Sequence, residues 1–134
     1  MSRDTGLQSP RIQLELDVQR RRALMTMPAG LSSARLARAT AGLLADDPTL
    51  ATLDWIVDQT ANHEGCANTD ADIVLDAYLR CPRPPGRRYT CVITHDLYFS
   101  LWAVSLDLRF GDRTHKAFAQ LTSATQFLEI ADRS

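Results

Sequence analysis

An unbroken alternation of apolar and polar residues near the start of the chain restricts its fold more than any other feature. Ile12, Leu14, Leu16 and Val18 alternate with polar side chains over residues 11–19. A period of two gathers the apolar side chains on one face of a strand, whereas a helix would spread them around its axis. Because a strand that buries one face needs partner strands, we expect this segment to lie in a sheet.

The partner strands are expected after a proline-rich loop. Residues 81–86 contain three prolines and one glycine, which end a helix and begin a loop. Alternation resumes beyond this loop, and we interpret 88–110 as a hairpin with its turn near 95–98, paired with the segment 11–19. The second strand of the hairpin is predicted from one apolar face that comprises Trp102, Val104, Leu106, Leu108 and Phe110.

Helical spacing of apolar residues and helix-start signals mark the remaining segments. Asp47 followed by Pro48 is a typical N-cap with its first helical residue. Ser32 or Ser33 can cap an earlier helix in the same way. The predicted helices cover about 32–47, 48–62, 68–80 and 113–132.

These elements predict one α+β domain, with a three-stranded, mainly antiparallel sheet and helices packed on one side. The predicted order is strand, helix, helix, helix, strand, strand, helix, and the single apolar face of each strand favours antiparallel pairing. We assign residues 11–134 to this domain and residues 1–10 to a disordered N-terminal tail. A chain of 134 residues is long enough to bury a hydrophobic core without a metal or disulfides.

Composition and cysteine content indicate the compartment. The apolar run 97–106 is far shorter than the roughly 20 residues that a membrane-spanning helix needs, and residues 1–10 lack the apolar stretch of a secretory signal. The three cysteines are an odd number and form no disulfide framework. Lys116 is the one lysine among fifteen basic residues, a bias typical of a GC-rich genome. We therefore expect a cytoplasmic bacterial protein with no membrane association.

Cys91, His95 and Asp96 fall within six positions and raise the question of a catalytic site. If 88–95 is a strand, the thiol and the imidazole lie four residues, or about 13 Å, apart. A nucleophile and its base need a separation of about 3 Å. We therefore interpret the trio as a strand that runs into a turn, with Cys91 as a buried thiol.

Other catalytic and metal-binding arrangements are also weak. The carboxylate pairs Asp54/Asp58 and Asp72/Asp76 have helical spacing and are interpreted as solvated helix faces. No phosphate-binding loop, nucleophile elbow or H-E-x-x-H motif occurs. We expect no catalytic, cofactor-binding or metal-binding residue, and no enzyme. A zinc site would have to be assembled, without two tight ligand pairs, from His63, Cys66, Cys81, Cys91 and His95.

The net charge of −1 hides a strong separation of charge along the chain. Residues 39–79 contain eight acidic side chains and no Lys or Arg, whereas 19–22 and 80–88 are rich in Arg. The Arg-rich segments can contact phosphates, but they can equally be solvated or paired with the acidic segment. The acidic segment can itself offer a surface to a basic partner.

Two tryptophans suggest a surface for interaction. In a helix over 48–62, Trp55 would point away from the apolar arc, so either that helix is buried on two sides or the indole binds a partner. The segment 97–104, which includes Trp102, is apolar on both faces and leaves more apolar surface than one layer of helices covers. The candidate interaction surface comprises Trp55, Trp102, Arg83, Arg87 and Arg88.

The sequence thus favours a small non-enzymatic accessory or regulatory protein that acts through protein–protein binding as a homodimer. Three strands leave two unpaired sheet edges, which favours self-association, and two-fold dimers are the commonest oligomers. The alternative is a nucleic-acid-binding regulator that uses 19–22 and 80–88. A small enzyme and a zinc protein remain further alternatives. No cofactor is expected.

Overall fold

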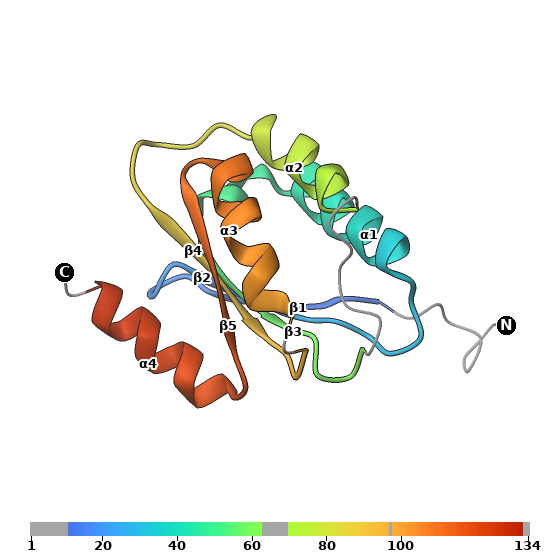
Figure 1. Ribbon diagram of the computed structural model, residues 1–134. Coiled ribbons are helices and arrows are strands. Elements are labelled where there is room, and N and C mark those ends of the chain that lie inside the picture. The colour runs from blue at the N-terminus through green and yellow to red at the C-terminus, as the bar shows by residue number, and fades with distance from the viewer. Residues whose placement is uncertain (1–10, 63–69, 97, 133–134) are drawn as a thin grey trace, which may run out of the picture.

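The computed structural model describes residues 11–62, 70–96 and 98–132, which form a five-stranded sheet with four α-helices (Figure 1). The predicted tail, residues 1–10, lies outside the described residues. The elements are β1 (Gln13–Asp17), β2 (Arg22–Thr26), α1 (Ser33–Asp46), the 3-10 helix η2 (Pro48–Thr52), β3 (Asp54–Asp58), α2 (Ala71–Leu79), β4 (Arg88–Ile93), α3 (Phe99–Phe110), β5 (Arg113–Phe118) and α4 (Leu121–Asp132).

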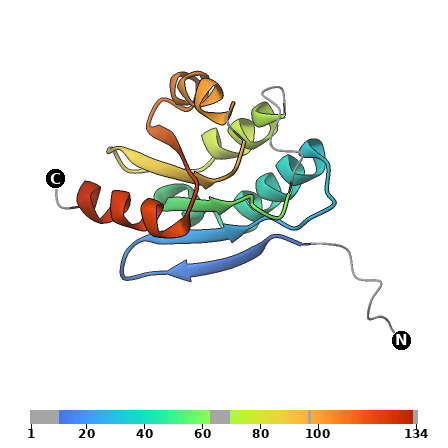
Figure 2. The same cartoon turned by 60° about the horizontal axis from the view of Figure 1, so that its bottom comes forward.

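The strands lie across the sheet in the same order as in the chain, β1-β2-β3-β4-β5. β1 and β2 are antiparallel, whereas β2, β3, β4 and β5 are parallel. Connections between parallel strands are almost always right-handed, so three connections that advance in one direction place their helices on one face. α1, α2 and α3 accordingly cover one face of the sheet, and α4 packs against the other (Figures 1 and 2).

The three-stranded, mainly antiparallel sheet predicted from the sequence is therefore wrong. Residues 48–62, predicted as one helix, contain η2 and the central strand β3. Trp55 and Val57 are buried against the helices on one face, and Ile56 is buried in the core beneath α4 on the other. A strand buried on both faces shows a continuous apolar run, which its period alone does not distinguish from a buried helix.

The second strand of the predicted hairpin is also wrong, because Phe99–Phe110 is helix α3. Residues 98–110 carry so many apolar side chains that a period of two and a helical period both fit them. Residues 113–118, predicted as the start of a helix, form β5 instead. The segment 22–26, interpreted as part of a link, forms β2.

The strand predicted at 11–19 is confirmed as β1, but it is buried only in part. Ile12 and Leu14 pack against the larger core, whereas Leu16 and Val18 are exposed. β1 pairs with β2 and not with β4, so it occupies an edge of the sheet (Figure 2). Among the described residues, no helix is long and apolar enough to cross a membrane.

Arg113, the first residue of β5, is a fully buried charged side chain. Its guanidinium carbon lies 3.9 Å from the ring centroid of Trp55 and 5.0 Å from that of Tyr78. The guanidinium nitrogens donate four hydrogen bonds to η2, β4 and the residue before β3, so this side chain ties the amino-terminal edge of the sheet together. The acceptors are the carbonyl oxygens of Ala51, Leu53 and Tyr89 and the hydroxyl oxygen of Thr90, at 3.1, 2.7, 3.0 and 3.2 Å.

We predict that Arg113→Met lowers the free energy of unfolding by at least about 3 kcal/mol, because it leaves several buried acceptors without a donor. Urea denaturation of the purified variant measures the loss. Arg38→Gln, which changes an exposed arginine of α1, should stay within about 0.5 kcal/mol of the wild type. A loss below about 1 kcal/mol for Arg113→Met would contradict the structural role assigned to this side chain.

Candidate functional site

The two tryptophans of the predicted interaction surface occupy different environments. Trp55 is 3% exposed on β3, and its Nε1–H donates to the carbonyl oxygen of Leu50 at 2.8 Å. Its ring packs edge-on against Tyr78, with centroids 5.8 Å apart. Trp102 is half-buried on α3. Of the two interpretations of Trp55, the structure therefore shows burial in the core.

Arg83 and Arg88 point inward and pair with Asp112. Nε of Arg83 lies 2.7 Å and Nη1 of Arg88 lies 3.4 Å from Oδ2 of Asp112, while the hydroxyl of Tyr78 donates to Oδ1 at 2.8 Å. Burial opposes the ionisation of Asp112, but the hydrogen bonds from Arg83 and Tyr78 outweigh it and lower its pKa. These two arginines anchor the start of β4. Arg87 is exposed and donates to the carbonyl oxygen of Gly111 at 3.0 Å.

The two Arg-rich segments, which are about 60 residues apart in the chain, meet at one cleft of about 640 Å³. The cleft lies at the amino-terminal edge of the parallel strands, and Asp132 at the end of α4 forms part of its wall. Its positive charge is partly neutralised, because Arg20 pairs with Asp17 at 3.0 Å and Arg22 pairs with Asp132 at 3.2 Å. Its charged lining comprises Arg20, Arg21, Arg87, Arg88, Asp54 and Asp132.

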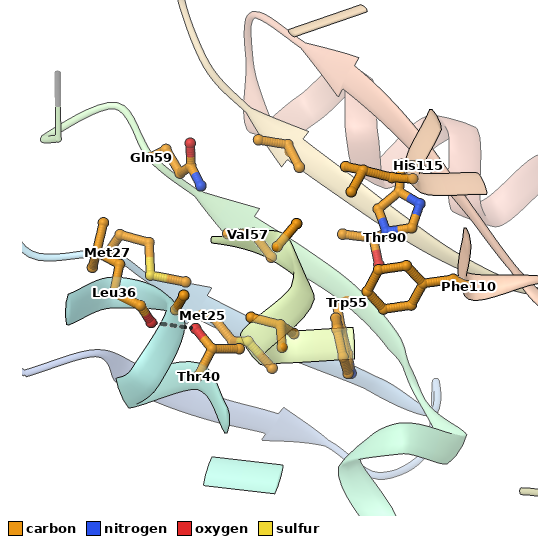
Figure 3. Close-up of a pocket in the computed structure, with 15 residues that line it drawn as sticks. Met25, Met27, Leu36, Thr40, Trp55, Val57, Gln59, Thr90, Phe110 and His115 are labelled. Atoms are coloured by element: carbon orange, nitrogen blue, oxygen red, sulfur yellow. Dashed lines mark hydrogen bonds between the residues drawn. The ribbon is translucent and has the colours of Figure 1, made fainter. Parts of the chain in front are cut away.

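A second hollow, which we call the sheet–helix pocket, lies between the sheet and the layer formed by α1, α2 and α3 (Figure 3). Its volume is about 90 Å³, and its walls are mainly apolar. Residues that follow β2 and β3 contribute to it, so it reaches the carboxyl ends of the parallel strands. Its apolar walls include Met25, Met27, Leu36, Val57, Val74 and Phe110.

Four buried polar side chains also line the sheet–helix pocket: Thr40, Gln59, Thr90 and His115. The two hydroxyls are already hydrogen-bonded, because Thr40 donates to the carbonyl oxygen of Leu36 at 2.9 Å and Thr90 accepts from Arg113. Gln59 is 9% exposed, and its side-chain amide makes no hydrogen bond to any described residue. Its amide atoms are not among the fully buried unpaired atoms of the described residues, so they remain accessible from the pocket.

His115 is held in one orientation by Asp107, on the last turns of α3. Its Nδ1 lies 3.0 Å from Oδ1 of Asp107, and its backbone N–H donates to the same oxygen at 2.6 Å. Burial lowers the pKa of His115 to about 4, against the opposing effect of Asp107, so the ring is neutral near pH 7. The hydrogen on Nδ1 then donates to Asp107, and Nε2 is an acceptor. Nε2 makes no hydrogen bond to a described residue, and it is not fully enclosed.

This arrangement does not amount to a nucleophilic triad. Thr90 and His115 are neighbours across β4 and β5, but no hydrogen bond joins their side chains. A triad requires the nucleophile to donate to the base, whereas the hydroxyl oxygen of Thr90 accepts from Arg113 and is not hydrogen-bonded to His115. The pocket is therefore equipped to accept a hydrogen bond from a ligand rather than to attack one.

The earlier catalytic and metal candidates are dispersed. Cys91 is fully buried in the core beneath α4, and burial raises its pKa to about 12, whereas His95 is exposed beyond the end of β4. Cys81 is also a buried free thiol. No group of three or more metal-ligating side chains comes together within the described residues. His63 and Cys66 lie outside those residues.

The acidic pairs are not two helix faces. Asp54 and Asp58 begin and end β3, and burial raises the pKa of Asp54 although it accepts a hydrogen bond from the backbone N–H of Tyr89. Asp72 and Asp76 are exposed on α2, as predicted. Neither pair lines the sheet–helix pocket.

Sequence reasoning missed Gln59, which follows β3, Asp107 in α3 and His115 in β5. Their only signal was a polar residue beside or within an apolar strand, as in the glutamine that follows the run 54–58. Comparison of the chain with models of protein families, with curated proteins and with solved structures finds no match. The function is therefore argued from the geometry of this chain alone.

We predict that acid destabilises the fold between about pH 6.5 and pH 4 through His115. The pKa of His115 is about 4 in the folded protein, against 6.5 for a histidine that is not buried. The unfolded chain therefore binds more protons between these two pH values, and the free energy of unfolding falls as the pH falls. The full shift corresponds to roughly 3 kcal/mol. The pKa of Asp112 is lowered by folding, so its protonation reduces stability only at a pH below this window. The pKa of Asp54 is raised by folding, so its protonation increases stability as the pH falls.

Urea denaturation at pH 7 and pH 4.5 measures this dependence. His115→Gln should flatten it, because the variant lacks the titrating ring, whereas His95→Gln, which changes an exposed histidine, should retain it. An equal loss of stability in His115→Gln and in the wild type would show that another group is responsible.

Proposed function

We propose that the protein is a non-enzymatic accessory protein that acts by protein–protein binding, with a second copy of itself as the partner. A stripe of exposed apolar side chains on α3, which we call the α3 stripe, supports this proposal. Its members recur at intervals of three, three and four residues, which places them on one side of a helix. The stripe comprises Tyr98, Leu101, Val104 and Leu108, which are 69, 74, 64 and 81% exposed.

The charged side chains beside the α3 stripe have partners within the same chain. Asp107 keeps its negative charge, because the ring of His115 is neutral, but its Oδ1 accepts hydrogen bonds from the buried His115, and Arg109 forms an ion pair with Asp72 on α2. The four side chains of the stripe itself carry no charge, so two copies can approach through them without placing like charges face to face. Contiguous exposed apolar surface on a soluble protein is typical of an interaction site.

The spacing of the stripe favours a second copy over an unrelated partner. An isologous two-fold contact between antiparallel helices pairs each position with its mirror position along the helix. Under this reversal Tyr98 meets Leu108 of the second copy, and Leu101 meets Val104, so every apolar side chain finds an apolar counterpart. α3 also lies over β5, at the edge of the sheet, where a partner can approach (Figure 2).

This route differs from the one predicted from the sequence. Residues 100–110 were expected to offer the unpaired edge of a strand, but they belong to α3, whose backbone is hydrogen-bonded within the helix. The exposed apolar side chains of Tyr98, Leu101 and Val104 still provide apolar surface that association would bury. One helix face is smaller than the roughly 800 Å² per partner of a standard interface, so we expect a dimer that dissociates at micromolar concentration.

A second candidate function is the binding of nucleic-acid phosphates at the Arg-rich cleft. It is supported by the meeting of segments 19–22 and 80–88 at that cleft. Arg20, Arg22, Arg83 and Arg88 are engaged by acidic side chains, however, which leaves little uncompensated charge. A steep fall of oligonucleotide affinity with salt would favour this function over the first.

We predict that the wild type shifts from the monomer mass of 14.9 kDa toward twice that value as its concentration rises from about 1 to 200 μM. The double variant Leu101→Lys/Leu108→Lys should stay monomeric, because it sets four ammonium groups against one another in the dimer. Light scattering coupled to size exclusion measures both.

Val18→Lys is the matched control, since it also replaces an exposed apolar residue but lies beside β1, at the opposite edge of the sheet. It should associate like the wild type. A wild type that remains at 14.9 kDa throughout the series would refute self-association, and a dimer unaffected by the double variant would refute the α3 stripe as its interface.

A further inference from the structure

We propose that the sheet–helix pocket binds a small neutral molecule with an apolar body and a hydroxyl group, and that this hydroxyl donates a hydrogen bond to Nε2 of His115. This proposal does not rest on the self-association proposed for α3. The proposal rests on unpaired polar groups, on the shape and position of the hollow, and on the absence of charge in its described walls.

The first observation is that two polar side chains of low exposure face the pocket. Gln59 and His115 are 9 and 7% exposed, and neither the amide of Gln59 nor Nε2 of His115 is hydrogen-bonded to a described residue. Their polar atoms are not fully enclosed, because the fully buried side-chain atoms without a partner in the described part of the chain are Nε of Arg22 and Nε of Arg113. A ligand in the hollow can therefore reach them and take the place of water as their partner.

The second observation is the arrangement of these groups. Gln59 and His115 lie well apart in the pocket, with Val57 and Trp55 between them (Figure 3). An occupant therefore touches mainly apolar walls and meets a hydrogen-bonding group at either end. This is the usual composition of a small-molecule site, in which a few polar groups orient a largely apolar ligand.

The third observation is the position and size of the hollow. The pocket reaches the carboxyl ends of β2 and β3, the edge of a parallel sheet at which ligands of α/β proteins bind. A dry cavity of about 150 Å³ holds benzene, so 90 Å³ suits a somewhat smaller molecule or a ring that projects from it. Met25 and Met27 form part of the wall, and flexible methionine side chains adapt to such a ring.

Charge selects the class of ligand. None of the described residues that line the pocket is Lys, Arg, Asp or Glu, and the ring of His115 is neutral near pH 7. An anion would therefore lose its hydration without gaining a counter-charge. Asp107 fixes the tautomer of His115 so that Nε2 accepts, and the ligand must then supply the donor.

Three probes of similar shape test these statements: phenol, toluene and benzoate. We expect phenol to bind with millimolar affinity, about five-fold more tightly than toluene, because only phenol can donate to Nε2. Benzoate should not bind. Two-dimensional NMR of the 15N-labelled full chain reads out each titration, and the largest shifts should fall on residues of the pocket, including Val57, Val92 and His115.

Two variants localise the effect. His115→Leu removes the acceptor, so phenol should lose its advantage over toluene. Ala71→Leu fills the pocket from the start of α2 and should abolish the binding of both probes while His115 is retained. Ala45→Leu, the same change at an exposed position of α1, is the control and should bind phenol like the wild type.

Titrations of the wild type with the three probes can overturn the proposal by themselves, even if a variant fails to fold. No shift of pocket residues with about 10 mM phenol would refute the site. Equal affinity for toluene and phenol would refute the role of His115, and preferential binding of benzoate would refute the neutral ligand class. Undiminished binding by a folded Ala71→Leu variant would place the ligand elsewhere.

Discussion

The buried guanidinium of Arg113 is the interaction on which the rest of the structure depends. It joins η2, β4 and β5 through hydrogen bonds and stacks on Trp55, so it fixes where β5 begins. Two residues before Arg113, Gly111 follows the end of α3 with φ +82°, a conformation that favours glycine. With this corner fixed, the last turns of α3 return over β5, and Asp107 comes to lie against His115. The geometry of the sheet–helix pocket therefore depends on the turn between α3 and β5 that Gly111 and Arg113 fix.

Local signals were enough for several elements and insufficient for the sheet. The helices at Ser33–Asp46 and Ala71–Leu79 and the strand at Arg88–Ile93 lie where capping residues and periodicity placed them, and Ser32 does cap the first helix. The central strand Asp54–Asp58 was missed because burial on both faces removes alternation. Without that strand the remaining ones looked like an antiparallel hairpin, and the parallel crossovers could not be predicted.

The candidate site was harder to predict, for a physical reason. Thr90 and His115 are brought together by the register of the parallel strands β4 and β5, Asp107 is added by a helix, and Gln59 lines the other end of the pocket, just after β3. No spacing along the chain encodes such a register. The residues that looked chemical in the sequence are those with short spacing, such as Cys91 and His95, and a strand carries them apart. In this chain, closeness in sequence was a poor guide to closeness in the pocket.

Both proposals involve α3, and this imposes a relation between them. Val104 and Leu108 point outward in the α3 stripe, whereas Leu106 and Phe110 line the pocket on the inner side of the same helix. A ligand that fills the pocket holds this helix against the sheet and restricts its motion. Less conformational entropy of the helix is then lost when the dimer forms. If both sites operate, linkage then requires the dimer to bind the ligand more tightly than the monomer does, by the same factor by which the ligand strengthens the dimer.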